Sequence, residues 1–190
     1  MPELSVDLVE RFYAILAMAA IAFIVLLLTL RILAIQSDPA LDAYASIARA
    51  IQTRAVLGAW IVATLATVGS LYFSEVARFT PCTLCWYQRI AMYPLVVIFG
   101  TALVRRERRP PTGTAVLAGI GAVIAAYHVA LEWFPSLDSG ACSASVPCTL
   151  VWFRVFGVFS LPTLALTAFL LILTLLLVRD PDEPDRWSDR

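Results

Sequence analysis

The stretch "FSLPTLALTAFLLILTLLLV", Phe159 to Val178, contains no charged residue. An apolar run of about 20 residues has the length that a helix needs to cross the hydrocarbon core of a bilayer. The whole chain has the same character, because 61% of its 190 residues are hydrophobic and 15% are charged, with a mean hydropathy of +0.83. Soluble globular domains are far less apolar, so the sequence predicts an integral membrane protein.

Four similar runs precede this stretch. They show no alternation of period two, and a chain in lipid must satisfy its backbone hydrogen bonds internally, which favours helices. The third run is short unless Trp86 to Arg89 belongs to it. We therefore predict an all-α, polytopic membrane bundle, with its earlier helices at Tyr13–Leu30, Ala55–Phe73, Ile90–Val104 and Thr114–Trp133.

The arginines predict the orientation in the membrane. All 14 basic residues are arginine and they balance 14 acidic residues, so the net charge gives no sign of a nucleic-acid partner. The densest cluster, "RRERRPPTG" at Arg105 to Gly113, predicts a cytoplasmic loop. Alternation then places residues 78–85 and 134–158 outside, and 36–54 and 179–190 inside.

The N-terminal run is predicted to be a retained helix with its N-terminus outside. Its leader "MPELSVDLVER" is acidic with one arginine, whereas a secretory signal peptide begins with positive charge. The linker that follows, at residues 36–54, is predicted to be a short amphipathic helix at the interface.

Four cysteines share the outer side in this topology, as two close pairs: Cys82 with Cys85, and Cys142 with Cys148. Disulfides persist on that side of a cell membrane. The second pair lies in the flexible loop "GACSASVPCTLVWF". It could be a redox pair or a disulfide that only staples the loop. A zinc site of all four cysteines is a further alternative, for which the second pair is widely spaced.

The first pair is predicted to lie at the start of a membrane helix. Pro81 suits a first helical turn, and the exposed N–H groups and dipole there stabilise a thiolate on Cys82 or Cys85. Arg89 lies one turn further along the same face. An arginine in the membrane needs an anionic partner, either a Cys85 thiolate or a reduced, anionic cofactor. The alternative is an interfacial arginine that reaches the lipid headgroups.

His128 and Glu132 share a face of the fourth predicted membrane helix. Polar groups inside a membrane helix indicate a functional site, and both would line one pocket if they faced Arg89. The alternative is a polar pair that is hydrated at the level of the lipid headgroups.

Two cysteine pairs on one side, one of them beside a buried cation, predict a thiol–disulfide relay. The electron acceptor would be dissolved in the membrane, and a quinone is the obvious class.

The segment "PCTLCWYQR" resembles the P-C-x-L-C-x-x-x-R motif of the DsbB disulfide bond formation family. "YHVALEWFP" and "VPCTLVWFRVFGVFSLP" are similar to the family's fourth-helix segment and its run into the last helix, and the spacing of the second cysteine pair resembles the BdbC-type branch. The resemblance covers about Ala55 to Val178. It implies a four-helix bundle at 55–178, so that 1–54 adds an extra membrane helix and linker, and 179–190 a cytoplasmic tail.

The resemblance also implies roles for individual residues. Cys85 would meet a ubiquinone or menaquinone, Arg89 would stabilise the charge there, and His128 and Glu132 would lie near the same quinone. Cys142 and Cys148 would accept electrons from a DsbA-like, thioredoxin-fold thiol oxidase outside the bacterial cytoplasmic membrane. The partner would attack Cys142, and Cys148 would attack Cys82. This chemistry would support disulfide formation in exported proteins.

Two competing interpretations remain. Enzymes of the vitamin K epoxide reductase type also combine two cysteine pairs with a quinone, but their loop pair precedes the C-x-x-C, which is the reverse of the order here. A non-catalytic membrane scaffold with two structural disulfides is the second alternative. It predicts that Arg89 is dispensable and that a Cys82–Cys85 disulfide resists reduction.

Overall fold

The computed structural model describes residues 2–107, 111, 113–138, 140, 142 and 146–178. Within these residues the fold is helical, and Val155 and Phe159 form an isolated β-bridge outside any strand. The predicted tail at 179–190 and parts of both long loops lie outside the described residues. The elements are α1 (Pro2–Leu33), α2 (Asp38–Leu71), the π-helical turn η1 (Tyr72–Val76), α3 (Thr83–Val104), α4 (Thr114–Trp133), the short turn η2 (Pro135–Leu137) and α5 (Leu161–Leu177).

The structure confirms the predicted all-α membrane bundle. Helices α1 to α4 are long and apolar enough to cross a membrane. Helix α5 has 17 residues, which is at the lower end of the spanning range of about 17 to 25. Its sequence contains no charged residue, so α5 is also compatible with a position in the hydrocarbon core of the membrane. A Ser160–Thr163 capping box begins it.

Helix α2 corrects the prediction of a separate interfacial helix in the 36–54 linker. A single helix of 34 residues runs from Asp38 to Leu71. At a rise of 1.5 Å per residue it is about 51 Å long, well beyond the bilayer core of about 30 Å. Its first turns therefore extend past the hydrocarbon region rather than forming an element of their own.

Helix α3 begins where the sequence predicts. Cys82 is its N-cap residue, and the helix continues through Trp86 to Arg89 into the apolar run, with Pro94 inside it. The third membrane segment therefore has its full length. Both cysteines of the C-x-x-C lie at the opening turn, as predicted from Pro81.

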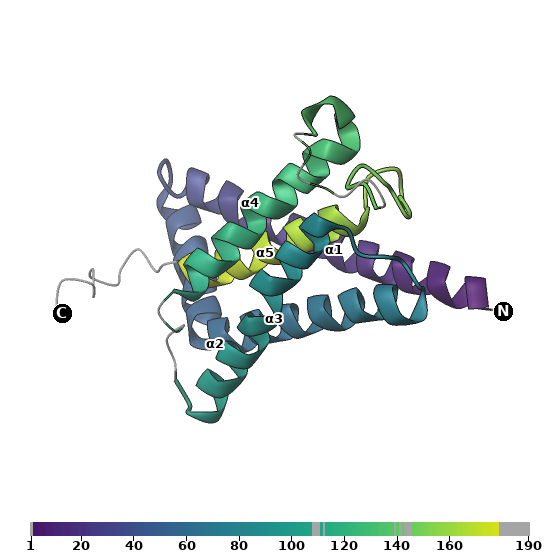
Figure 1. Ribbon diagram of the computed structural model, residues 1–190. Helices are drawn as coiled ribbons and strands as arrows, with labels where there is room; N and C mark the ends of the chain where they lie inside the picture. The colour runs from purple at the N-terminus through teal and green to yellow at the C-terminus, as the bar shows by residue number, and fades with distance from the viewer. Residues whose placement is uncertain are drawn as a thin grey trace.

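The helices α2, α3, α4 and α5 pack as a ring in which each contacts the next, and α1 lies against α2 and α5 (Figure 1). Phe99 and Phe169 are fully buried in the core of this ring. Gly121 lets α4 approach α5 closely, because a Cβ there would lie 2.3 Å from the Phe169 ring. Small residues permit this close contact between membrane helices.

Candidate redox-active site

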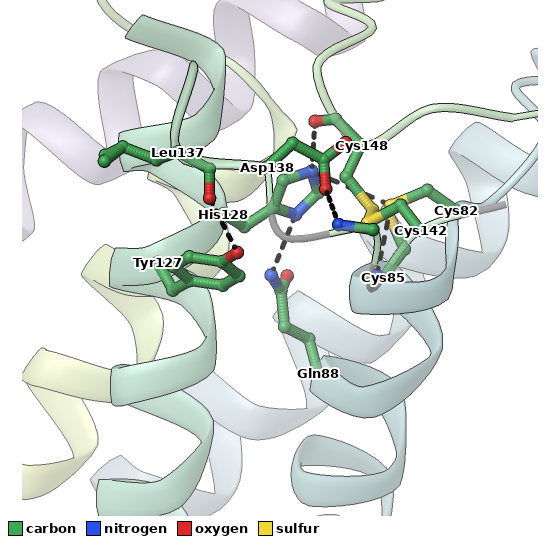
Figure 2. The surroundings of a disulfide bond; sticks show 10 residues. Cys82, Cys85, Gln88, Tyr127, His128, Leu137, Asp138, Cys142 and Cys148 are labelled. Carbon is green, nitrogen blue, oxygen red and sulfur yellow. Dashed lines mark hydrogen bonds between the residues drawn. A yellow bond between two sulfur atoms is a disulfide. The ribbon is translucent and has the colours of Figure 1, made fainter. Parts of the chain in front are cut away.

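All four cysteines gather at one end of the bundle. Cys82 and Cys148 are buried in one cluster, and Cys85 and Cys142 pack against it. Cys142 and Cys148 form a disulfide, while Cys82 and Cys85 are free, with 2.9 Å between their sulfur atoms. Loop and helix cysteines that are 57 to 66 residues apart in sequence therefore form one thiol–disulfide cluster (Figure 2).

His128 joins the two cysteine pairs. Its Nε2 lies 3.7 Å from the Cys82 sulfur and 3.1 Å from the carbonyl oxygen of Cys148. The Gln88 amide lies 3.1 Å from Nδ1 on the other side of the ring (Figure 2). If the amide donates to Nδ1, the Nε2 proton is directed at Cys148 and Cys82. The His128 ring then links the loop to the start of α3.

Cys82 has the surroundings of a stabilised thiolate. As the N-cap residue it accepts a hydrogen bond from the Cys85 backbone N–H at 3.3 Å. The hydrogen bond from the Cys85 side chain, followed by the hydrogen bond and charge of His128, lowers the pKa of the Cys82 thiol from 9.0 to about 4. Burial acts in the opposite direction but does not prevail.

We expect the reduced protein to hold a thiolate on Cys82 at neutral pH. Its pKa lies well below that of a free thiol because of the hydrogen bonds from Cys85 and His128, so the sulfur is charged at neutral pH and becomes protonated only in acid. An ultraviolet titration of thiolate absorbance in the reduced protein checks this. Cys82→Ser is the control and should remove the low-pH transition, and His128→Gln should move it to higher pH. A single transition near the pH of a free thiol would contradict the expectation.

Arg89 points its donors at α2. Its Nε donates to the Ser70 hydroxyl at 2.9 Å, and its Nη2 donates to the Ser70 carbonyl at 3.0 Å. The guanidinium also lies 5.2 Å from the centre of the Trp86 ring. Among the described residues no carboxylate forms an ion pair with Arg89. Its positive charge is therefore stabilised only by hydrogen bonds and a ring contact with neutral groups. An anion formed nearby would gain from this charge.

A cavity of about 520 Å³ is lined by Cys85, Gln88 and Arg89, by several hydroxyl-bearing residues, and for the rest mainly by apolar side chains. Of the four cysteines, only Cys85 lines it. A volume of 300–1,000 Å³ with few polar groups is typical of a small-molecule site. An apolar molecule with a polar ring would therefore fit, with its ring beside the Cys85 sulfur.

His128 and Glu132 do not line this cavity. With Cys82 and Cys85 they line a second, much smaller pocket next to the 146–150 segment. His128 and Glu132 therefore do not face Arg89 across one pocket in this structure, which was the condition for the predicted shared site. The reason is the rotation of α4, which turns this face towards the loop rather than towards α2.

Glu132 instead anchors the loop that carries Cys148. Its carboxylate accepts a hydrogen bond from the Ser160 hydroxyl at 2.6 Å and lies 3.7 Å from the Arg154 guanidinium. The Glu132 side chain is only 2% exposed. Arg154 also stacks over Trp133, 4.3 Å from the ring centre. These contacts hold both ends of the 154–160 segment against α4.

Cys82, Cys85 and His128 offer three possible metal-ligand atoms within 4.8 Å of one another. The alternative of a zinc site made by all four cysteines does not fit this arrangement, because Cys142 and Cys148 are already bonded to each other. A metal requires free thiolates. The redox interpretation of the second pair is compatible with the disulfide.

Sequence reasoning missed Gln88, Ser70 and Arg154. Gln88 is a buried amide one turn after Cys85, and its place beside the C-x-x-C could have marked it. Ser70 carries no such local signal because it lies on α2, and Arg154 carries none because its partner Glu132 lies on α4, 22 residues earlier in the chain. Only the packing of α2 and of the loop brings them in.

A helical membrane bundle with a dithiol beside a disulfide is the arrangement expected of a membrane protein that carries out thiol–disulfide exchange. The family model described as disulfide bond formation protein DsbB matches residues 52–179. The chain therefore belongs to the DsbB family of disulfide bond formation proteins. Membership in this family implies oxidoreductase activity.

Curated relatives agree with this assignment. A probable disulfide formation protein of Oceanobacillus iheyensis is 42% identical over 125 residues, which is 64% of this chain and 86% of that protein. Disulfide bond formation protein C of Bacillus subtilis is 44% identical over 115 residues, which is 60% of this chain and 83% of that protein. No solved structure gives a significant match. The branch to which the chain is similar is thus the one named disulfide formation protein C.

Proposed function

We propose that this protein takes electrons from the dithiol of an extracytoplasmic, thioredoxin-fold partner and delivers them to a membrane quinone, ubiquinone or menaquinone. The observation that supports this most directly is the position of Cys85. It packs against the thiol–disulfide cluster and also lines the large apolar cavity beside Arg89. A single side chain therefore connects a site for disulfide exchange to a site for a lipid-soluble acceptor.

The first step in this proposal is exchange at the loop. A partner thiolate attacks Cys142, which is partly exposed, whereas Cys148 is 1% exposed. The partner's second thiol then releases it as a disulfide and leaves Cys142 and Cys148 reduced. Two electrons have moved to the loop pair. Trapping a partner on Cys148 rather than Cys142 would overturn this order.

The second step passes the electrons to the helix pair. With Cys82 and Cys85 oxidised, the Cys148 thiolate attacks Cys82, and Cys85 leaves as the thiolate. Cys142 then attacks Cys148, which restores the loop disulfide and leaves Cys82 and Cys85 as a dithiol. The buried cluster of Cys82 and Cys148 supports this route, because the exchange requires direct approach of the two sulfur atoms.

The third step reoxidises the helix pair. A quinone, when bound, accepts two electrons and two protons. Arg89 would hold the negative charge that develops beside Cys85, and the apolar walls of the cavity would hold the side chain of the ring. The Cys82–Cys85 disulfide is then ready for the next cycle, and electrons and protons balance.

The experiment measures quinone reduction by absorbance when the protein in detergent meets a reduced thioredoxin-fold oxidase and a soluble quinone. We expect wild type to turn over. Arg89→Ala should lower kcat/KM for quinone by about 10- to 150-fold, because a charged hydrogen bond contributes roughly 1.5–3 kcal/mol. The matched control is Arg11→Ala, since Arg11 pairs with Asp7 at an exposed position. An inactive wild type whose disulfides resist reductant would instead support the scaffold alternative.

We also propose that residues 55–178 form the relay core in the bacterial cytoplasmic membrane, with the cysteines outside and the 105–113 loop inside. The arginines of that loop support this sidedness. Labelling of reduced Cys142 by a membrane-impermeant maleimide in intact cells checks it. Labelling of Cys142 only after the cells are lysed would show that the topology is the reverse of the one proposed.

A further inference from the structure

Helix α1 lies outside the segment that the family model matches, which begins at residue 52, yet it forms one wall of the large cavity. The other walls come from α2, the start of α3 and α5. Helix α1 packs against both α2 and α5 and so lies along the seam between them (Figure 1). An element added to the family core therefore takes part in the site next to Cys85.

The cavity has one polar end and a long apolar remainder. Cys85, Gln88, Arg89 and Ser70 lie at the polar end. Along α2 the lining continues as far as Gly58, twelve residues from Ser70, which corresponds to about 18 Å of helix. This length along α2 suits a ring with an apolar tail better than a compact molecule, and we call the space the channel.

The contacts of α1 are specific at the polar end. The Tyr13 hydroxyl donates to the Leu65 carbonyl at 3.0 Å. The Tyr13 ring lies so close to Gly69 that a Cβ there would be 2.6 Å from it. Ala14 is fully buried, in a cluster with Phe159 at the start of α5. These contacts place α1 in one register on the bundle.

Small side chains of α1 leave the channel open in this register. Three of the six α1 residues that line it are alanines, namely Ala17, Ala19 and Ala20. The neighbouring Ile21 does not line it and is 42% exposed on another face of the helix. Larger residues at the three alanine positions would fill the space between α1 and the α2–α5 seam. The three alanines thus leave room in the channel, in addition to any part they have in helix packing.

We propose that α1 completes a binding channel for the isoprenoid tail of the membrane quinone, and that it makes affinity depend on that tail. This inference rests on the proposed function, since the ring of the same quinone would lie beside Cys85 and Arg89. The occupant is a quinone tail rather than a phospholipid chain because the channel leads directly to the sulfur that is to be oxidised. The core alone would bind the ring, and α1 would add contacts with the tail.

The test compares Ala20→Trp, which fills the channel, with Ile21→Trp on the exposed face. The probes are decylubiquinone and the same dimethoxy-methyl-benzoquinone ring without a side chain. For Ala20→Trp we expect the KM for decylubiquinone to rise about tenfold, as when contact with two or more methylenes is lost. The KM for the tailless ring and both KM values of Ile21→Trp should stay at wild-type levels.

A second readout does not depend on turnover. Long-chain quinone extracted from the purified proteins should fall by more than half in Ala20→Trp and remain unchanged in Ile21→Trp. Ala20→Ile adds a smaller side chain and should give an intermediate loss of bound quinone. It replaces Ala20→Trp in the test if the tryptophan variant does not fold. Equal effects on both probes, or no effect of Ala20 substitutions on either readout, would overturn the role of α1. A wild type that reduces neither quinone would instead refute the proposed function.

Discussion

Replacing Cys85 with serine is expected to abolish electron transfer to quinone and to leave the fold intact. A serine hydroxyl has nearly the same size but forms no disulfide, so the Cys82–Cys85 bond can no longer be made. Cys85 is also the cysteine that lines the large cavity. Quinone reduction driven by a reduced partner should therefore fall to the background of the uncatalysed mixture.

The same variant should accumulate a specific disulfide. With Cys85 absent, the Cys82 thiolate can still attack Cys148 in the adjacent loop disulfide, which releases Cys142 as the thiolate, and no neighbouring thiol on α3 displaces Cys82. We expect a bond between Cys82 and Cys148 in peptide maps of acid-quenched, non-reduced protein. The control is Cys82→Ser, which should be equally inactive but should not form this bond. Partial quinone reduction by Cys85→Ser would contradict the assigned path.

Replacing Arg154 with methionine is expected to loosen the loop that carries Cys148 and to destabilise the protein. The Glu132 carboxylate is 2% exposed and would keep only the hydrogen bond from Ser160. Removing one partner of a buried ion pair costs about 3–5 kcal/mol, because the other charge remains buried. The Arg154 side chain is 28% exposed, so we expect a loss of about 3 kcal/mol, at the lower end of that range.

Limited proteolysis and hydrogen exchange of residues 146–160 measure this effect. Glu132→Gln should be milder, because it removes the buried charge and can keep a hydrogen bond with Ser160. The matched control is Arg105→Met, since Arg105 is 76% exposed and its pair with Glu107 is 4.0 Å long. Surface pairs of that kind contribute about 0–1 kcal/mol. If Arg154→Met were no more labile than Arg105→Met, the ion pair would not anchor the loop.

The membrane helices were largely predictable because their signals are local. The run Thr114–Trp133 matches α4 at both ends, and Pro81 with the C-x-x-C marks the start of α3. Length and apolarity determine whether a segment can cross lipid, and both are properties of consecutive residues. The exception was the 36–54 linker, where polar composition concealed a helix continuous with α2. A helix that leaves the membrane keeps its backbone hydrogen bonds, so polarity does not end it.

The surroundings of the site were only partly predictable. The sequence places His128 and Glu132 on one face of a helix, but it does not show towards which neighbour that face turns. His128 contacts Gln88 and the cysteines, whereas Glu132 pairs with Arg154. Such contacts depend on how α4 is rotated against α3 and the loop.

The sequence by itself determined that this protein is a helical membrane protein with two cysteine pairs at neighbouring positions in the topology, since composition and spacing are sufficient for that. Only the tertiary structure decided that Cys85 opens onto an apolar cavity while Cys82 lies in the buried cluster beside Cys148. It also decided that α1 forms one wall of that cavity. The physical reason is that length and polarity act along the chain, whereas a cavity and its walls arise from the shapes of side chains on helices that are distant in sequence.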